Sequence, residues 1–245
     1  MGHYSYKKGD NFTVMQAAIL AGGLATRLGN LTTNQPKSLV PINGKAFLEY
    51  QLAFLARSGV RDIVLCLGHL GQMIPRHFGN GRNYGVNIKY SFEEKPLGTA
   101  GALKNAEALL NDTFLTLYGD SYLSLDFHQV LSMIKSENKL GVMTVFKNYN
   151  RYDRSNTAVK GNLVRRYSKN GQTDDTVYID YGANAFKKEV LKMIPEGQFY
   201  SLENLFIQLI EIEELLAFEV KERFYEIGSL RGLKEFEQYI SEGTK

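Results

Sequence analysis

The residues whose types and spacing favour a particular chemistry lie near the start of the chain. The apolar run VMQAAIL (14–20) leads into Gly22 and Gly23, Arg27 follows four residues later, and Lys37 stands directly behind a proline. Glycines after a strand let backbone N–H groups approach an anion, and both cations can bind phosphate oxygens. The pattern predicts a phosphate-binding loop. Taken alone, the glycine pair fits a plain strand-exit turn with two solvated cations equally well.

Two other phosphate-binding motifs are excluded by the residues around these glycines. A P-loop requires a lysine and a Ser/Thr directly after its last glycine, whereas Leu24, Ala25 and Thr26 follow Gly23. A dinucleotide fingerprint requires G-x-G-x-x-G, which the segment GGLATRLG does not supply. The missing fingerprint argues against an NAD(P)-dependent oxidoreductase.

The elements that must position these residues alternate along the first part of the chain. We expect strands at 14–20, 61–68, 85–93, 113–120 and 140–148, with helices at 46–59, 70–79, 98–111 and 126–138. This alternation predicts an α/β fold with a mainly parallel sheet and helices on both faces. It also predicts a ligand crevice at the carboxyl ends of the strands.

The segment from 149 to 245 has a different pattern. We expect a hairpin around Gly161-Asn162, helices at 187–194, 201–213 and 229–241, and short strands around 215–220 and 224–227. No linker separates the two parts, so we expect one domain over 14–245, with residues 1–13 an N-terminal extension or tag.

Composition limits the classes of function. The chain has 245 residues, of which 44% are hydrophobic and 22% charged, which suits a globular protein with a sizeable core. A net charge of +3 without a dense Lys/Arg run gives nucleic-acid binding little support. The single cysteine, Cys66, lies in an apolar run and indicates a buried thiol. Nothing suggests a membrane span or a secretory signal, so we expect a cytoplasmic protein without a membrane partner.

Several motifs in the same order resemble one family. The segment LAGGLATRLGNLTTNQPKSLVPINGKAFLEY (20–50) resembles the signature of the sugar-1-phosphate nucleotidyltransferases, the nucleotide-sugar pyrophosphorylases. Ala25 replaces the usual third glycine. The resemblance continues through EEKPLGTAGAL (93–103), YGDSYL (118–123), IDYGANAF (179–186) and FYEIGSLRGLKEF (224–236). It is strongest for the short bacterial mannose- and heptose-1-phosphate guanylyltransferases, and it implies their Rossmann-like mixed-sheet fold.

The resemblance implies nucleotidyl transfer. A phosphate oxygen of the acceptor attacks the α-phosphorus of a nucleoside triphosphate, and pyrophosphate leaves; the NDP-activated sugar would feed capsule or lipopolysaccharide synthesis. By resemblance, Arg27 holds the triphosphate and Lys37 neutralises charge where the two phosphates meet. Asp120 and Glu226 would hold Mg²⁺, although relatives have an aspartate at position 226. For Asp120 the alternative is a turn-forming residue, and for Glu226 a surface strand residue.

The resemblance also implies a nucleotide-binding part (14–148) and an acceptor-binding part (149–245). The expected nucleotide-binding residues are Leu20, Ala21, Gly22, Gly23, Thr26, Arg27, Glu93, Pro96, Gly98 and Thr99. Glu93 stands where thymidylyl-transferring relatives have a glutamine. A carboxylate only accepts hydrogen bonds, so it suits guanine N1/N2 or cytosine N4 better than uracil or thymine. Glu94 is adjacent, so the assignment could move by one position.

The expected acceptor-binding residues are Lys169, Asp180, Tyr181 and Gly182. Lys169 lies near the lysine with which relatives bind the sugar phosphate, and a solvated hairpin lysine is the alternative. Asp180 and Tyr181 replace an asparagine and an alanine, and Tyr181 would reshape the acceptor pocket. A hexose, a heptose and a smaller polyol phosphate all remain open, as does a homo-oligomer.

Three hypotheses follow. The favoured one is an enzyme that joins GTP to a hexose- or heptose-1-phosphate, and its nearest rival is a cytidylyltransferase for a polyol or sugar phosphate. A third, from another class, is a catalytically inactive nucleotide-binding regulatory subunit. The presence of Arg27, Lys37 and Asp120 argues against it.

Overall fold

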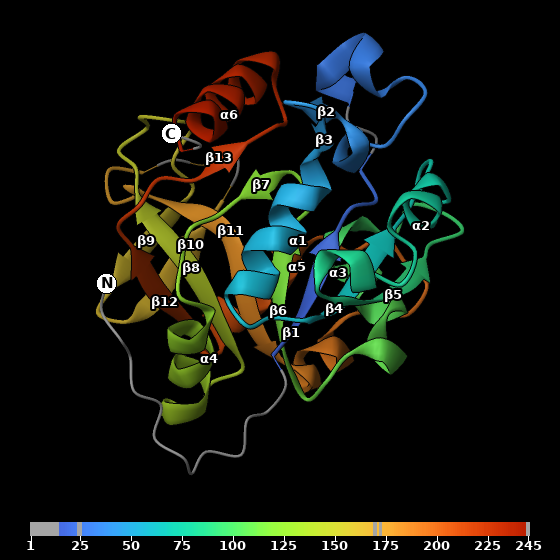
Figure 1. Cartoon of the computed structure of the whole chain (residues 1–245). Helices are drawn as coiled ribbons and strands as arrows, with labels where there is room; N and C mark the ends of the chain where they lie inside the picture. The colour runs from blue at the N-terminus through green and yellow to red at the C-terminus, as the bar shows by residue number, and fades with distance from the viewer. Residues whose placement is uncertain (1–14, 24–25, 169–170, 172, 244–245) are drawn as a thin grey trace, which may run out of the picture.

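The computed structural model describes residues 15–23, 26–168, 171 and 173–243 (Figure 1). The expected extension at 1–13 and Lys169 therefore lie outside the described residues. A nine-stranded sheet forms the centre of the molecule, in the order β5-β4-β1-β6-β11-β8-β12-β10-β9. Its strands are β1 (Gln16–Leu20), β4 (Asp62–Leu67), β5 (Asn87–Phe92), β6 (Thr113–Tyr118), β8 (Gly141–Lys147), β9 (Thr157–Lys160), β10 (Leu163–Tyr167), β11 (Tyr178–Lys187) and β12 (Leu215–Val220).

The direction of the strands confirms the predicted mainly parallel mixed sheet. Strands β5, β4, β1 and β6 pair in parallel, as do β8 and β12. Strand β11 runs antiparallel between β6 and β8, and β10 and β9 add an antiparallel hairpin. Because β4, β1 and β6 are parallel neighbours, their carboxyl ends meet at one edge of the sheet.

Helices cover both faces of the sheet, as predicted (Figure 1). They are α1 (Phe47–Arg57), α2 (Met73–Phe78), α3 (Gly98–Asn105), α4 (Phe127–Ser136), α5 (Leu202–Glu211) and α6 (Leu230–Glu242). The alternation of side chains along β1 separates the two faces. Ala17 and Ile19 pack with α1 and α4, whereas Ala18 packs with α3 and α5. Within the described residues, no helix combines the length and the apolar character needed to cross a membrane.

Two short ribbons lie beside the main sheet. Strand β2 (Pro41–Ile42) pairs with β3 (Lys45–Ala46), and β7 (Ser121–Tyr122) pairs with β13 (Tyr225–Glu226). A third apolar cluster joins α6 to α1, where the rings of Phe236 and Phe47 lie edge to face at 5.3 Å. The β7–β13 ribbon brings the segment before α6 to the end of β6.

Two expectations need correction. Strand β11, in the middle of the sheet, was not expected, because its sequence contains Asp180, Gly182 and Asn184, types that are depleted in strands. Its register shifts between Asp180 and Asn184, and Gly182 adopts φ +96° there. The helix expected at 187–194 is a 3-10 segment, η5 (Lys188–Met193).

Candidate active site

A cavity of about 610 Å³ opens at the carboxyl ends of β1, β4 and β6, where the sequence predicted a crevice. It is lined by Leu20, Ala21, Gly22, Gly23, Lys37, Ser38, Cys66, Gly68, His69, Glu93, Glu94, Lys95, Pro96, Gly98, Thr99, Ala102, Tyr118, Gly119, Asp120 and Phe199. Its size suits a small-molecule ligand.

The two glycines after β1 have different surroundings. A Cβ on Gly22 would lie 3.0 Å from Glu93 Oε1 and 3.2 Å from the Gly68 backbone nitrogen, so a side chain there would meet the end of β4. A Cβ on Gly23 would meet no heavy atom within 4 Å in the described part of the chain, and Gly23 is exposed. Gly22 therefore allows the end of β1 to pack closely against the end of β4. Gly23 leaves its backbone accessible to a ligand in the cavity.

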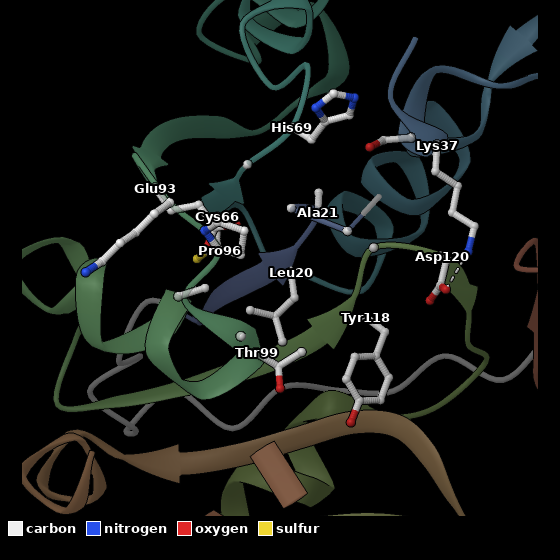
Figure 2. A pocket seen from close by; sticks show the side chains of 18 of the residues that line it. Leu20, Ala21, Lys37, Cys66, His69, Glu93, Pro96, Thr99, Tyr118 and Asp120 are labelled. Carbon is white, nitrogen blue, oxygen red and sulfur yellow. Dashed lines mark hydrogen bonds and ion pairs between the residues drawn. The ribbon is translucent and has the colours of Figure 1, made fainter. Parts of the chain in front are cut away.

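One end of the cavity carries an ion pair. Lys37 begins the short segment η2 (Lys37–Leu39), and its Nζ lies 2.7 Å from Asp120 Oδ2 (Figure 2). The side chains are 15% and 34% exposed, and both line the cavity, so the partly buried pair is accessible to a ligand there. Ile227 N–H donates to the Asp120 carbonyl at 2.9 Å, which ties Asp120 to the segment after β13.

The other end of the cavity carries Glu93 (Figure 2). Its Oε2 accepts a hydrogen bond from Leu97 N–H at 3.1 Å, and Oε1 lies against the Gly22 and Gly68 backbones. Burial raises the pKa of Glu93, and the Leu97 hydrogen bond opposes that rise. A carboxylate oxygen can accept more than one hydrogen bond, so the fixed group can still receive a ligand donor.

Cys66 is a buried thiol at this end, as the sequence predicted. Burial, followed by the nearby Glu93 carboxylate, raises its pKa to about 12. The thiol is therefore neutral at physiological pH and acts as an apolar part of the lining.

Two of the expected acceptor residues, Asp180 and Gly182, lie behind this lining. Asp180 Oδ2 accepts from the Tyr118 hydroxyl at 2.9 Å, and Oδ1 accepts from Gly182 N–H at 3.0 Å. Tyr118 itself lines the cavity. Burial, and then the Asp180 charge, raise the pKa of Tyr118 well above its ordinary value, so the phenol stays protonated and donates. A Cβ on Gly182 would lie 3.2 Å from the Tyr118 ring, so Gly182 makes room for that ring.

Tyr181 does not reach the cavity. Its side chain is 1% exposed and belongs to the core on the α1 and α4 face. Its hydroxyl lies 3.3 Å from the Ser124 backbone and 3.4 Å from the Arg223 carbonyl. The expectation that Tyr181 reshapes an acceptor pocket therefore needs correction: packing against the segments at 123–125 and 223–224 keeps it from direct contact with a ligand.

The Glu226 carboxylate forms hydrogen bonds within the turn that precedes α6. Its Oε2 accepts from Gly228 N–H and its Oε1 from the Ser229 hydroxyl at 2.7 Å. A Cβ on Gly232 would lie 2.2 Å from Oε1, so the carboxylate fills space that this glycine leaves at the start of α6. In this arrangement the Glu226 carboxylate stabilises the turn at the start of α6.

Of the two carboxylates expected to bind Mg²⁺, Asp120 is the one that lines the cavity. No cluster of three or more His, Cys, Asp or Glu side chains suited to a metal occurs within the described residues. Mg²⁺ in nucleotide enzymes is commonly held by one or two carboxylates together with substrate phosphates. Asp120, which lines the cavity, suits such a site, whereas both Glu226 oxygens already accept hydrogen bonds within the turn.

Some functional positions escaped the sequence analysis, and others lie outside the described part. Tyr118 is the last residue of β6, and His69 lies two residues after β4; both line the cavity, and their place at strand ends is a signal that the sequence contained. Phe199 comes from the distant 195–201 segment and carried no local signal. The structure describes the backbone of Thr26 and Arg27 at the start of η1 (Thr26–Thr32) but not their side chains.

The carboxyl ends of parallel strands in an α/β sheet are a common place for a nucleotide or another small ligand, and comparison with known proteins identifies the class of enzyme. The family model described as "Nucleotidyl transferase" matches residues 16–220, and the chain belongs to this family of enzymes. This confirms the predicted family.

Individual relatives agree with that assignment. The chain is 32% identical over 205 residues to D-glycero-alpha-D-manno-heptose 1-phosphate guanylyltransferase of Campylobacter jejuni, covering 84% of this chain and 83% of that protein. Identity is also 32% over 171 residues to the enzyme of the same name from Aneurinibacillus thermoaerophilus, covering 67% and 74%. The crystal structure of HddC from Yersinia pseudotuberculosis superposes with a TM-score of 0.77 at 24% identity, covering 92% of this chain and 99% of that one, which confirms the fold.

Proposed function

We propose that this nucleotidyltransferase joins GTP to a hexose- or heptose-1-phosphate and releases pyrophosphate. The observation that carries the proposal is the cavity with Lys37 and Asp120 at one end and Glu93 at the other. A nucleotide lying across the ends of β1 and β4 would place its base by Glu93 and its phosphates by Lys37. The names of the two heptose-1-phosphate guanylyltransferases support guanine as the base and a heptose as the acceptor sugar.

The Glu93 carboxylate is proposed to recognise the base. Guanine presents N1–H and N2–H on one edge, and both can donate to a carboxylate. Cytosine offers its N4 amino group to the same carboxylate, so a cytidylyltransferase is the second candidate. The guanylyltransferase relatives favour guanine.

The Lys37 ammonium is proposed to act during bond formation. The acceptor phosphate oxygen attacks the α-phosphorus, the bond to the bridging oxygen of the pyrophosphate breaks, and pyrophosphate carries away the electron pair. Two anions at about 4 Å repel by about 4 kcal/mol at an effective dielectric constant of 20, so a cation between them lowers the barrier. Arg27 is proposed to bind the triphosphate on the pyrophosphate side.

Asp120 would hold Mg²⁺ together with the nucleotide phosphates. The ion, when bound, would neutralise phosphate charge and bring carboxylate and phosphate together. Asp120 Oδ2 also pairs with the Lys37 ammonium at 2.7 Å, so the residue orients that ammonium.

Asp180 is proposed to orient the acceptor through Tyr118, because Tyr118 donates to Asp180 and lines the cavity. Lys169 is proposed to bind the acceptor phosphate. The product class is an NDP-activated sugar for surface polysaccharide, made in the cytoplasm where nucleoside triphosphates are supplied.

Substitution of Lys37 tests the mechanism. Lys37→Ala should lower kcat for pyrophosphate release roughly 10²- to 10³-fold, the usual effect of losing a group that stabilises developing charge. Lys89→Ala is a matched control, because Lys89 is 45% exposed, lies on β5 and forms only a long 3.8 Å ion pair with Asp62. Equal activity of the Lys37→Ala and Lys89→Ala variants would contradict the proposed role.

A further inference from the structure

Phe199 is an exposed aromatic side chain at the rim of the cavity. It is 68% exposed, more than any other exposed large apolar side chain in the described part of the chain, and it lines the cavity. A single exposed apolar residue is ordinary on a protein surface. What distinguishes Phe199 is the structure that holds it there.

The backbone beside Phe199 is fixed to the start of α3. Tyr200 N–H donates to the Leu97 carbonyl at 2.7 Å, and the Tyr200 carbonyl accepts from Ala100 N–H and Gly101 N–H, both at 3.0 Å. A ligand that contacts the Phe199 ring would therefore not have to order this backbone, which lowers the entropic cost of the contact.

Two glycines permit this close docking. Gly98 adopts φ +72°, and a Cβ there would lie 2.7 Å from the Tyr200 carbonyl oxygen and 3.2 Å from Phe199 Cε2. A Cβ on Gly101 would lie 2.9 Å from the Gln198 carbonyl oxygen. Both glycines allow the 198–200 segment to pack closely on α3. This packing places the Phe199 ring beside Gly98, which lines the cavity.

The charges and donors at this end favour a base over a phosphate. Two of the four N-terminal backbone donors of α3, the N–H groups of Ala100 and Gly101, are occupied by the Tyr200 carbonyl. The Glu93 and Glu94 carboxylates line the same end, with the Lys95 ammonium as the opposing charge. The ion-paired Lys37 lies at the other end (Figure 2).

We propose that Phe199 stacks on the base of the bound nucleotide and fixes its plane for the Glu93 carboxylate. Aromatic rings stack on any base, so the contact contributes affinity and Glu93 contributes selectivity. The inference rests on the proposed function only in requiring that the cavity holds a nucleotide, whichever base that nucleotide carries.

A tryptophan probe tests the contact directly. The chain contains no tryptophan, so Phe199→Trp produces a protein with one indole at the rim of the cavity. Binding of GTP should quench or shift its fluorescence, whereas ribose 5-triphosphate, which lacks a base, should leave the spectrum unchanged. An identical spectrum with and without saturating GTP would overturn the proposal.

Calorimetric affinities provide the second measurement. Phe199→Ala should raise the Kd for GTP about 5- to 150-fold, the range expected for one lost stacking contact, and leave the Kd for ribose 5-triphosphate unchanged. Phe199→Tyr should bind GTP within about twofold of the wild type, because the ring is kept. Ile207→Ala is the control, since Ile207 is 42% exposed on α5 away from the cavity lining.

The outcomes separate this inference from the proposed function. Unchanged GTP affinity in Phe199→Ala, or an equal loss for ribose 5-triphosphate, would overturn the stacking contact alone. A wild type that binds CTP or UTP instead of GTP would contradict the guanine assignment, and the same variants would then be tested with that nucleotide. A wild type that binds no nucleoside triphosphate would overturn both.

Discussion

At the scale of single residues, the position of Glu93 links nucleotide binding to pH. Its carboxylate is held by Leu97 N–H and packed against two glycine backbones, and burial raises its pKa above the ordinary value of 4.5. Only the charged form accepts from both guanine donors. The structure thus predicts that Glu93 loses its charge at a higher pH than an exposed glutamate does.

The affinity for GTP should therefore fall on acidification. As the pH falls through the raised pKa of Glu93, the Kd for GTP should increase, approaching tenfold per pH unit below it. Glu93→Gln should bind GTP more weakly and without this pH dependence, as measured by calorimetry from pH 4.5 to 8. If the dependence persists in Glu93→Gln and disappears in Glu94→Gln, the base-recognition residue is Glu94.

The contribution of Glu93 to the free energy of unfolding should depend on pH in the opposite direction to the affinity for GTP. A raised pKa means that the folded state favours the protonated carboxyl, so this contribution is fully present below the ordinary pKa of 4.5 and is lost as pH rises through the folded-state value. Glu93→Gln should accordingly have a higher Tm than the wild type at neutral pH, with the difference shrinking in acid. A lower Tm of the variant at neutral pH would contradict this account of burial.

At the scale of elements, the β7–β13 ribbon and the first turn of α6 hold the residues around Asp120. Glu226 accepts from Gly228 N–H and the Ser229 hydroxyl, and Ile227 N–H donates to the Asp120 carbonyl. We assign Glu226 to this turn, through which it positions Asp120.

Substitutions of Glu226 and Asp120 should consequently separate effects on metal affinity from effects on stability. Glu226→Gln should bind Mn²⁺ in the GTP complex within about twofold of the wild type, whereas Asp120→Asn should bind it at least about tenfold more weakly. Glu226→Ala, which loses both hydrogen bonds, should be less stable by about 1–3 kcal/mol. The measurements are electron paramagnetic resonance of Mn²⁺ and thermal unfolding. Equal weakening of Mn²⁺ binding by Glu226→Gln and Asp120→Asn would make Glu226 a metal ligand.

The elements also show which features a sequence can predict. Helix α1 was expected at 46–59 and is found at Phe47–Arg57, because its apolar spacing and Gly59, at φ +81°, are local signals. Strand β11 was missed because its neighbours β6 and β8, rather than its own residue types, make it a strand.

The same limit applies to the cavity. Gly22, Lys37, Glu93 and Asp120 belong to recognisable motifs, and the structure brings them to one cavity. Phe199 reaches it only through backbone hydrogen bonds to α3, a contact between distant segments that no motif records.

At the scale of the whole molecule, the two expected parts share one sheet. Strand β11, from the 149–245 part, lies between β6 and β8 of the 14–148 part, and β12 pairs with β8. Removal of the second part would leave β6 and β8 without their shared neighbour and uncover buried residues on both faces.

The chain should therefore unfold as one unit. In urea, the full chain is expected to lose its circular dichroism in a single transition, because one core on each face spans both parts. A fragment of residues 15–148 should give no cooperative transition. A fragment with its own sharp transition would instead establish an independent domain.

The most direct test of the central claim is pyrophosphate release from each of GTP, CTP, UTP and dTTP, with mannose-1-phosphate and D-glycero-α-D-manno-heptose 1-phosphate as acceptors. The account predicts the highest kcat/KM with GTP and a sugar-1-phosphate, and a much reduced preference for GTP over UTP in Glu93→Gln. Turnover with UTP or dTTP but not with GTP or CTP would contradict it.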